Sequence, residues 1–475
     1  MASVAQYDMI VIGGGSAGLV TSAGCAGIGA RVALVAQGRL GGECLWNGCV
    51  PSKAMIACAR AASEARHAAR FGVAVRDVSV DFGGVMRWIR EAQQSIAPHD
   101  SPERFRSLGV DVITGAASFA GHRRVTVNGQ TLEAKRITIA TGSVPAIPPV
   151  KGLDTVPFLT NETIFDLDQQ PRTLLILGGG PVGLELAQAF ARLGTTVHVV
   201  EMAAQLLPRE DRELADMLGD CLRADGVTLL LGTKASRVAA VDGSIQLTAT
   251  KGDGSEVTLR GDALLVATGR TANIKSLELD KGGIEANDTG IVVDDTLRTS
   301  ARGVWAAGDC VGPLRFTHVA EYDARLVVRN AFFPFASKAN HDGIPWVTYT
   351  APELAHVGLT PDAARQRYGD SVKVWSKPFS EVDRAVTDGH THGMVKLVTD
   401  HRGKILGGHI LGHGAGDMIG EITIAMHNGL SAAKLANTIH PYPTYSDAIR
   451  RAADDFQKSR FTKVPRAIAR WFATR

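Results

Sequence analysis

The sequence predicts an α/β protein with two Rossmann-like domains and a separate C-terminal α+β domain. Three observations support this fold class. Apolar runs such as MIVI and LLIL precede glycine turns and helical patterns, one glycine motif occurs twice, and runs typical of antiparallel strands begin near residue 341. Alternating strands and helices are typical of parallel sheets covered by helices. A chain of 475 residues is too long for one hydrophobic core, so several domains are expected.

The duplicated motif is Gly13-x-Gly15-x-x-Gly18 after MIVI and Gly178-x-Gly180-x-x-Gly183 after LLIL. In both copies a second strand-like run, RVALVA or TVHVVE, ends 23 residues after the first glycine. Such glycines permit a tight turn, close approach to a pyrophosphate and close packing of helix on strand, while the helix N-terminus attracts the phosphates. Two copies with matched spacing predict two dinucleotide sites, although two purely structural glycine turns are an alternative.

The residues at the end of each second strand suggest which nucleotide binds. Glu201 ends the second strand of the second copy, and a carboxylate there accepts hydrogen bonds from ribose hydroxyls and repels a 2′-phosphate. We therefore expect NADH to be preferred over NADPH. The first copy ends in Ala36-Gln37, so only the amide of Gln37 is available to a ribose.

A close cysteine pair follows the first copy, in the run GGECLWNGCVPSK at 41–53. The spacing of Cys44 and Cys49 allows the Cα separation of ~4.4–6.8 Å that a disulfide needs. Cys49 lies near the start of a helical pattern that continues to Gly72, with Lys53 close by, and both features favour a thiolate. The pair is interpreted as redox-active. A structural disulfide or half of a metal site is the alternative, but no further Cys or His follows at zinc spacing, so no metal site is predicted.

The charge balance excludes some partners. Lys and Arg total 51 and Asp and Glu 48, a net charge of +3. The chain therefore lacks the excess of positive charge that is typical of nucleic-acid-binding proteins. No apolar run is long enough to span a membrane. The N-terminal run has no basic lead-in and is broken by glycines, so we expect no signal peptide and a cytoplasmic protein.

Together, GGECLWNGCVPSK, the two glycine motifs, ATGS at 140–143, ATGR at 267–270 and AAGD at 306–309 resemble the class I pyridine nucleotide-disulfide oxidoreductases. This family includes dihydrolipoamide dehydrogenase, glutathione reductase and mercuric reductase. The resemblance implies bound FAD, NAD(P)H as the electron donor and a homodimer. It further implies that the C-terminal domain pairs two subunits and lends a motif to the active site of the partner.

The resemblance also implies a division of the chain. Residues 1–150 are the first part of the FAD-binding domain and residues 151–270 the NAD(P)-binding domain. Residues 271–340 are the second part of the FAD-binding or central domain, and residues 341–475 form the dimerisation domain.

Residue roles follow from the same resemblance. Cys44 is the thiol that meets the substrate, Cys49 is the thiolate against the flavin, and Lys53 approaches the flavin and pairs with Glu185. Asp309 binds the ribityl chain of FAD; from the residues alone, a turn aspartate is an alternative, as is a core histidine for His318. The cofactor-binding residues are expected to be Gly13, Gly15, Ser16, Ala17, Gly18, Gln37, Gly42, Glu43, Lys53, Gly115, Ala116, Ala140, Thr141, Gly142, Gly178, Gly180, Pro181, Val182, Gly183, Glu185, Glu201, Gly269, Arg270, Gly308, Asp309, Phe316, Thr317 and His318.

The sequence departs from the family in two places. Pro181 replaces the tyrosine that gates the nicotinamide site in many members. At the C-terminus, thiol-reducing members have a His before Pro-Thr and a Glu five residues after that His, and here Tyr442 and Asp447 take those positions. Imidazole titrates near pH 7 and tyrosine near ~10, so tyrosine is a poor acid–base at neutral pH. His440 is the alternative acid–base, and a capping or surface role fits it equally well.

The function expected is an FAD-dependent NAD(P)H oxidoreductase with a core like mercuric reductase, reducing a disulfide or a thiol-bound metal through Cys44 and Cys49. The tail lacks the C-terminal cysteine pair of mercuric reductases. One alternative is a dihydrolipoamide dehydrogenase acting on a lipoyl protein. Another is a flavoprotein redox sensor that uses the cysteine pair.

Overall fold

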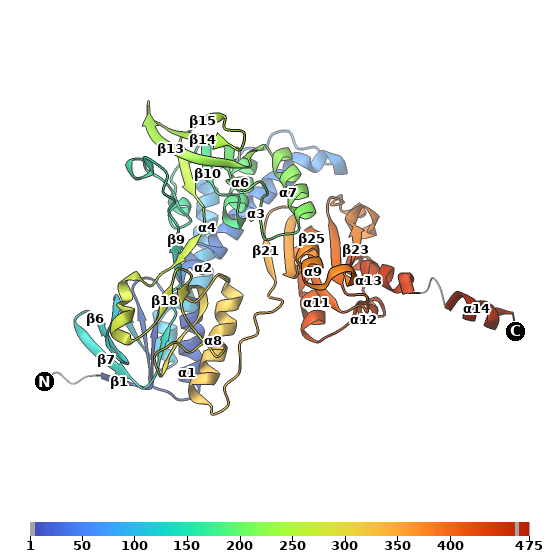
Figure 1. Ribbon diagram of the computed structural model, residues 1–475. Helices are drawn as coiled ribbons and strands as arrows, with labels where there is room; N and C mark the ends of the chain where they lie inside the picture. The colour runs from blue at the N-terminus through green and yellow to red at the C-terminus, as the bar shows by residue number, and fades with distance from the viewer. Residues whose placement is uncertain (1–4, 461–464, 475) are drawn as a thin grey trace. The chain divides into compact units, whose positions relative to one another are not determined.

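The computed structural model (Figure 1) describes residues 5–460 and 465–474, and the chain divides into two compact units. Unit 1 comprises Met1–Gly178, Arg237–Gln246 and Gly261–Asn340, and unit 2 comprises Gly179–Ser236, Leu247–Arg260 and His341–Arg475. Unit 1 therefore contains both ranges expected to form the FAD-binding domain. The finer division into four ranges stays a prediction.

Unit 1 is built on a five-stranded sheet in which every pairing is parallel. Its order is β20 (Val304–Ala306), β8 (Ile137–Ile139), β2 (Met9–Ile12), β3 (Val32–Ala36) and β4 (Val110–Thr114). All residues of β2 and β3 are buried, because both faces of the sheet are covered and each strand therefore reads as a continuous apolar run. The predicted strands around the first glycine motif are confirmed.

Alternate residues of β2 enter two different cores. Met9 and Val11 pack with α1 (Ser16–Gly27) and α8 (Thr317–Phe332), which lie side by side. Ile10 and Ile12 pack with a second, four-stranded sheet. That sheet has the order β1 (Ala5–Tyr7), β7 (Gln130–Ala134), β6 (Arg124–Val127) and β5 (Ala117–Gly121).

The other elements of unit 1 connect these layers. The helices are α2 (Gly42–Trp46), α3 (Cys49–His67), α4 (Phe82–Ile96) and α5 (Pro102–Ser107). The paired strands are β9 (Ser143–Pro145) with β17 (Arg270–Ala272), β10 (Thr173–Leu177) with β16 (Ala263–Val266), and β18 (Ala286–Asn287) with β19 (Gly290–Ile291). A 3₁₀ turn at Ala68–Phe71 follows α3 and ends at Gly72 in the left-handed conformation, as the helical pattern predicts.

Unit 2 begins in the second glycine motif. It contains α6 (Pro181–Leu193), β11 (Thr196–Val200), α7 (Arg212–Ala224) and β12 (Val227–Leu230), and β11 pairs in parallel with β12. A further sheet has the order β13 (Thr233–Val241), β14 (Ser244–Lys251) and β15 (Glu256–Gly261), and the division between the units falls within these strands.

The rest of unit 2 is a five-stranded antiparallel sheet. Its order is β21 (Trp346–Thr348), β22 (Glu353–Gly358), β25 (Ile405–Gly412), β24 (Met394–Thr399) and β23 (Lys373–Pro378). The helices α11 (Ala415–His427) and α13 (Asp447–Arg460) pack against it. The shorter helices are α9 (Pro361–Tyr368), α10 (Asp383–Thr387), α12 (Ala432–Ala436) and α14 (Pro465–Ala473). The predicted C-terminal α+β arrangement is confirmed.

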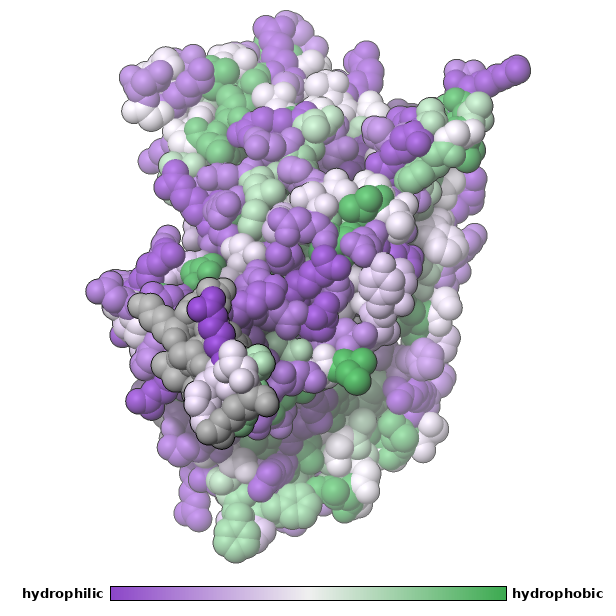
Figure 2. Space-filling view, turned by 90° about the vertical axis from the view of Figure 1, so that its right-hand side faces the viewer, coloured by the Kyte–Doolittle hydropathy of each residue, from purple (hydrophilic) through white to green (hydrophobic). Residues whose placement is uncertain are grey.

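Among residues 5–460 and 465–474, no helix is both long and apolar enough to cross a membrane. The face of the molecule drawn in Figure 2 is mostly hydrophilic, with separate hydrophobic patches.

Candidate active site

The first glycine motif forms a tight turn between β2 and α1. Gly13 has a φ of +121°, and a Cβ atom on Gly18 would lie 1.8 Å from the carbonyl oxygen of Gly13. Only glycines permit this contact between helix and strand. The helix α1 starts after Gly15, which has no side chain to cap the first amides of the helix. A Cβ on Gly42 would lie 2.5 Å from the Cα atom of Gly15. This narrow backbone cradle fits the pyrophosphate of FAD.

Gln37 and the pair Gly115-Ala116 are brought together by the register of two strands. Ala36 lies opposite Thr114 at the ends of β3 and β4, and the amide of Gly115 donates a hydrogen bond to the carbonyl oxygen of Ala36 at 2.9 Å. Gln37 and Ala116 are both exposed at this edge. Their position is consistent with the ribose and adenine roles predicted for them.

A third set of predicted residues follows two neighbouring strands of the same sheet. Ala140, Thr141 and Gly142 follow β8, and Gly308 and Asp309 follow β20, whose last residue Ala306 lies opposite Ile139. The hydroxyl of Ser143 donates a hydrogen bond to Oδ2 of Asp309 at 2.6 Å. All three sets lie at the carboxyl ends of the parallel strands, which is where open α/β sheets bind ligands.

The two cysteines lie in consecutive helices. Cys44 is in the short helix α2, and Cys49 is the first residue of α3, which has 19 residues. Lys53 follows one turn later on α3. A helix N-terminus stabilises a thiolate, so the position of Cys49 suits the role predicted for it.

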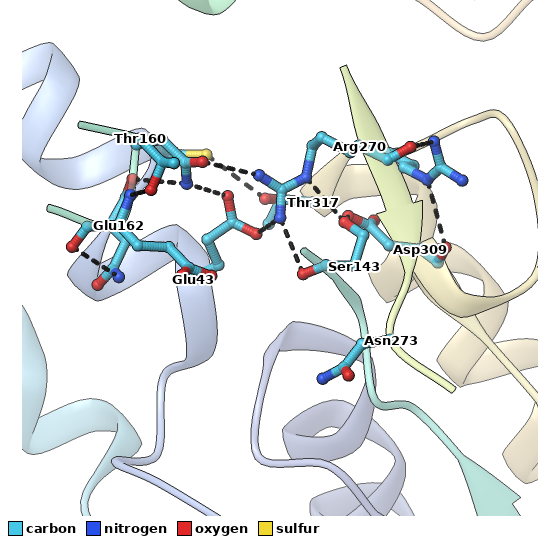
Figure 3. A network of polar contacts seen from close by, with 12 residues as sticks. Glu43, Ser143, Thr160, Glu162, Arg270, Asn273, Asp309 and Thr317 are labelled. Carbon is cyan, nitrogen blue, oxygen red and sulfur yellow. Dashed lines mark hydrogen bonds and ion pairs between the residues drawn. The ribbon is translucent and has the colours of Figure 1, made fainter. Parts of the chain in front are cut away.

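The groups around the cysteine pair shift the pKa of the Cys44 thiol. The hydrogen bond with Cys49 and then burial raise the pKa of Cys44, while Thr317 and Lys53 act in the opposite direction. Sγ of Cys49 lies 3.6 Å from Oγ1 of Thr317, the first residue of α8 (Figure 3). The structure therefore brings the predicted Phe316-Thr317-His318 segment to the cysteine pair.

A polar network links the cysteine segment to Asp309 (Figure 3). The guanidinium group of Arg270 forms an ion pair with Glu43 and donates from Nε to the hydroxyl of Ser143 at 2.8 Å. Asn161 donates to the other oxygen of Glu43 at 2.7 Å. Burial raises the pKa of Glu43 to about 7, and the charge of Arg270 opposes this rise. The ordered network holds the helix α2, which contains Cys44, against the strand β17.

Two members of this network are absent from the predicted site residues. Ser143 is part of the ATGS run, so its position signalled a role. Asn161 lies in no motif, and nothing in the sequence pattern points to it. The predicted residues Gly269 and Arg270 lie at the start of β17, where Gly269 has a φ of +132°.

The second glycine turn repeats the construction of the first. A Cβ on Gly178 would lie 2.4 Å from the carbonyl oxygen of Ala267. The helix α6 follows Gly180 and starts at Pro181, with Val182 and Gly183 in its first turn. The carboxylate of Glu201 accepts hydrogen bonds from the amides of Gly179 at 2.5 Å and Ala203 at 2.7 Å. Glu201 thus lies at the glycine turn, and its role toward a ribose stays a prediction.

Glu185 is buried in α6, with 6% of its surface exposed. Its Oε1 atom accepts a hydrogen bond from the backbone amide of Tyr349 at 2.8 Å. The pairing of Glu185 with Lys53 stays a prediction.

The two key positions of the C-terminal motif, Tyr442 and Asp447, do not form a histidine–carboxylate pair. Tyr442 is 70% exposed, and its hydroxyl donates a hydrogen bond to Asp383 at 2.8 Å. That hydrogen bond raises the pKa of Tyr442. Asp447 is buried between two cations, Arg450 and Arg451.

His440 instead has a carboxylate partner outside the motif. Its Nε2 atom lies 2.7 Å from Oε1 of Glu421 in α11, and its Nδ1 atom lies 2.9 Å from the carbonyl oxygen of Thr438. Burial lowers the pKa of His440, but the hydrogen bonds to Glu421 and Thr438 outweigh it, so the pKa is raised. Glu421 and Asp383 lie in no sequence motif and are absent from the predicted site residues.

Two family descriptions match the chain. Pyridine nucleotide-disulphide oxidoreductase matches residues 7–324, and its dimerisation domain matches residues 344–453. The chain belongs to the pyridine nucleotide-disulphide oxidoreductase family. Family members are NAD(P)H-dependent flavin disulfide oxidoreductases, so the protein is an enzyme of this kind that uses FAD and NAD(P)H. The second match supports the predicted homodimer.

Curated relatives carry two different activities in their names. A mercuric reductase of Streptomyces lividans is 36% identical, over 95% of this chain and 96% of its own length. A dihydrolipoyl dehydrogenase of Chlorobaculum tepidum is 33% identical, over 96% of this chain and 98% of its own length. Among solved structures, the Cu(II) complex of the HOCl-induced flavoprotein disulfide reductase RclA from Escherichia coli is similar with a TM-score of 0.85 at 29% identity, covering 94% of this chain and 99% of that one.

Proposed function

We propose that this enzyme passes electrons from NADH through Cys44 and Cys49 to a metal ion held by those sulfurs. The observation that carries the proposal is the state of the C-terminal motif. The hydroxyl of Tyr442 donates a hydrogen bond to Asp383, and Asp447 is neutralised by two arginines. A disulfide acceptor is the second possibility within the same function.

The two acceptors differ in their need for protons. Reducing a disulfide to two thiols requires a proton for each sulfur, and a well-placed imidazole supplies protons near pH 7. Reducing a metal ion bound by two thiolates adds electrons to the metal and no proton. Tyr442 is a weaker acid than an ordinary tyrosine because Asp383 raises its pKa. The motif therefore suits the acceptor that needs no proton.

When bound, FAD supplies the two-electron carrier between nicotinamide and sulfur. The protein contributes the remaining parts. The cradle of Gly13, Gly15 and Gly18 holds the pyrophosphate, Asp309 binds the ribityl chain, and the start of α3 favours the thiolate of Cys49. Cys44 then meets the acceptor. The names of the Streptomyces lividans reductase and of the copper complex of RclA fit a metal acceptor.

An acceptor screen tests the proposal. The purified holoenzyme is supplied with NADH and either Hg²⁺ or Cu²⁺, in parallel with small disulfides and lipoamide. Metal-dependent NADH oxidation at least tenfold above that with any disulfide is expected, and Cys44→Ser abolishes it. Cys58→Ser is the matched control, since Cys58 lies on α3 outside the pair. Faster turnover with a disulfide than with either metal overturns the choice of acceptor.

The assignment of Cys49 has its own test. Reduction of the holoenzyme is expected to give a long-wavelength thiolate–flavin charge-transfer band, which is absent in Cys49→Ser. A band that persists in this variant shows that another group faces the flavin.

The second candidate function is that of a dihydrolipoyl dehydrogenase. The pair His440–Glu421 favours it, because an imidazole bound to a carboxylate is a competent acid–base. This candidate predicts turnover with dihydrolipoamide that survives Tyr442→Phe and falls at least 100-fold in His440→Ala and Glu421→Gln. Equal rates in all three variants refute it.

The coenzyme preference, the homodimer and a cytoplasmic location complete the proposal. Glu201 supports NADH over NADPH, and the dimerisation-domain match supports the dimer. In the proposed dimer, Tyr442 and His440 lie beside the cysteine pair of the partner, as the family resemblance implies. The strong exposure of Ile439 (96%) and Tyr442 (70%) in the isolated chain is consistent with such an interface.

A further inference from the structure

A row of four residues crosses the C-terminal sheet in register. Trp346 on β21 lies opposite His356 on β22, His356 lies opposite His409 on β25, and His409 lies opposite Lys396 on β24. Paired residues in neighbouring strands share a face of the sheet. The segment before α7 covers this row, because Asp211 pairs with Lys396 at 2.7 Å and Glu210 contacts the two histidines.

Both histidine rings are fixed by backbone carbonyl groups. Nε2 of His356 lies 2.8 Å from the carbonyl oxygen of Gly358, and Nε2 of His409 lies 3.0 Å from that of Leu359. A carbonyl oxygen only accepts hydrogen bonds, so each Nε2 must carry the hydrogen. A neutral ring of this tautomer presents a lone pair at Nδ1.

The ligand atoms of Glu210, His356 and His409 lie close together. Oε2 of Glu210 lies 3.3 Å from Nδ1 of His356, and the three ligand atoms of Glu210, His356 and His409 lie within 4.8 Å of one another. None of these three atoms has a hydrogen-bond partner among the described residues. The other carboxylate oxygen of Glu210 accepts a hydrogen bond from Nε1 of Trp346, so the carboxylate is held in place.

The cluster is buried, with 7% of Glu210, 2% of His356 and none of His409 exposed. Three acceptors that face one another without a donor are unfavourable, since a buried polar atom without a hydrogen-bond partner loses its hydration and gains nothing in return. A proton on Nδ1 of His356 would pair it with Glu210 and leave His409 unpaired. A single cation at the centre satisfies all three atoms.

We propose that Glu210, His356 and His409 bind one divalent transition-metal ion, of the Zn²⁺ class. Two imidazoles and one carboxylate suit Zn²⁺, Cu²⁺ or Ni²⁺ rather than Mg²⁺ or Ca²⁺. Ligand distances of ~2.0–2.2 Å in a tetrahedral site place neighbouring ligand atoms ~3.3 Å apart, which is the separation of Glu210 and His356. The backbone carbonyls that orient both rings, and the indole of Trp346 that orients Glu210, are the outer-shell partners that metal sites use.

The ion would be structural. It fastens the segment that follows the second glycine motif to the sheet of the C-terminal region, within unit 2. This site is independent of the proposed reaction at Cys44 and Cys49, because the three ligands lie on other elements. The sequence pattern does not indicate this site, since residues 210, 356 and 409 are far apart in the chain and none follows a zinc spacing.

Metal binding is tested on the holoenzyme with Cys44→Ser and Cys49→Ser, which removes thiol ligands. Equilibrium dialysis with Zn²⁺ after chelator treatment is expected to show one ion per chain and a raised melting temperature. Glu210→Gln and His409→Gln are expected to weaken binding at least tenfold. His413→Gln is the control, because His413 stacks on His390 elsewhere in unit 2. No bound Zn²⁺, or equal binding in Glu210→Gln, overturns the proposal.

A second measurement requires no change to the ligands. Trp346 stacks on His356 with ring centroids 3.8 Å apart, so a paramagnetic ion in the site quenches its fluorescence. Titration with Co²⁺ is expected to quench emission in the protein with the two cysteine changes, and to quench much less in the same protein with Trp346→Phe. Equal loss of emission in both proteins places the Co²⁺ ion elsewhere and overturns the assignment.

Discussion

The exchange Gly18→Ala tests the nucleotide cradle most directly. The added Cβ atom would lie 1.8 Å from the carbonyl oxygen and 2.9 Å from the carbonyl carbon of Gly13. Gly13 has little room to withdraw, because its amide donates a hydrogen bond to the carbonyl oxygen of Val35 at 2.8 Å. The helix α1 must therefore move away from β2, and it is packed against α8.

The free-energy cost of Gly18→Ala depends on which atoms must move to make room for the Cβ atom. Adding a methylene to a packed core costs about 1–3 kcal/mol when side chains yield. Here both partners are backbone, so we expect the upper end, about 3 kcal/mol. At about 1.4 kcal/mol per factor of ten, FAD affinity should fall roughly 100-fold.

The assay is the flavin content of the purified protein, followed by titration of the apoprotein with FAD. The matched control is Gly27→Ala at the other end of α1, where an added Cβ has nothing within 4 Å. That variant should retain its flavin and gain up to about 1 kcal/mol from helix propensity. A Gly18→Ala protein with full flavin content and unchanged melting temperature would refute the argument.

Three further predictions concern other parts of the chain. Glu201→Ala should lower kcat/KM for NADH more than for NADPH, and the reverse order in steady-state assays would contradict the coenzyme preference. Lys396 is buried beside Asp211, so Lys396→Met should cost about 3–5 kcal/mol in urea unfolding, with part of the loss recovered when Asp211→Asn is added; an unchanged midpoint would count against this. Glu421 raises the pKa of His440 in the folded state, so its stabilising effect is full below the unfolded pKa of ~6.5 and is lost as pH rises through the folded pKa. The stability deficit of His440→Asn should thus be larger at pH 6 than at pH 9, and a larger deficit at pH 9 would show the sign to be wrong.

The local sequence was sufficient to predict the strand–turn–helix units and the position of the cysteine pair. Gly13 and Gly18 are close together in the sequence, and so are Cys44 and Cys49. The spacing alone therefore constrains the geometry of each motif. Continuous apolar runs such as MIVI predicted a buried parallel strand, because a strand that is covered on both faces has apolar residues at every position. The sequence also predicted that residues following different strands lie at one edge of the sheet, since the carboxyl ends of parallel strands lie at the same edge.

Only the tertiary structure decided which distant side chains share a hydrogen bond or a charge. Arg270 reaches Glu43 across 227 positions, and His440 pairs with Glu421 in another helix rather than with the carboxylate of its own motif. Glu210, His356 and His409 meet through strand register and the packing of one loop. Sequence patterns record periodicity along the chain, whereas these contacts depend on how separate elements align in space, and no local rule encodes that alignment.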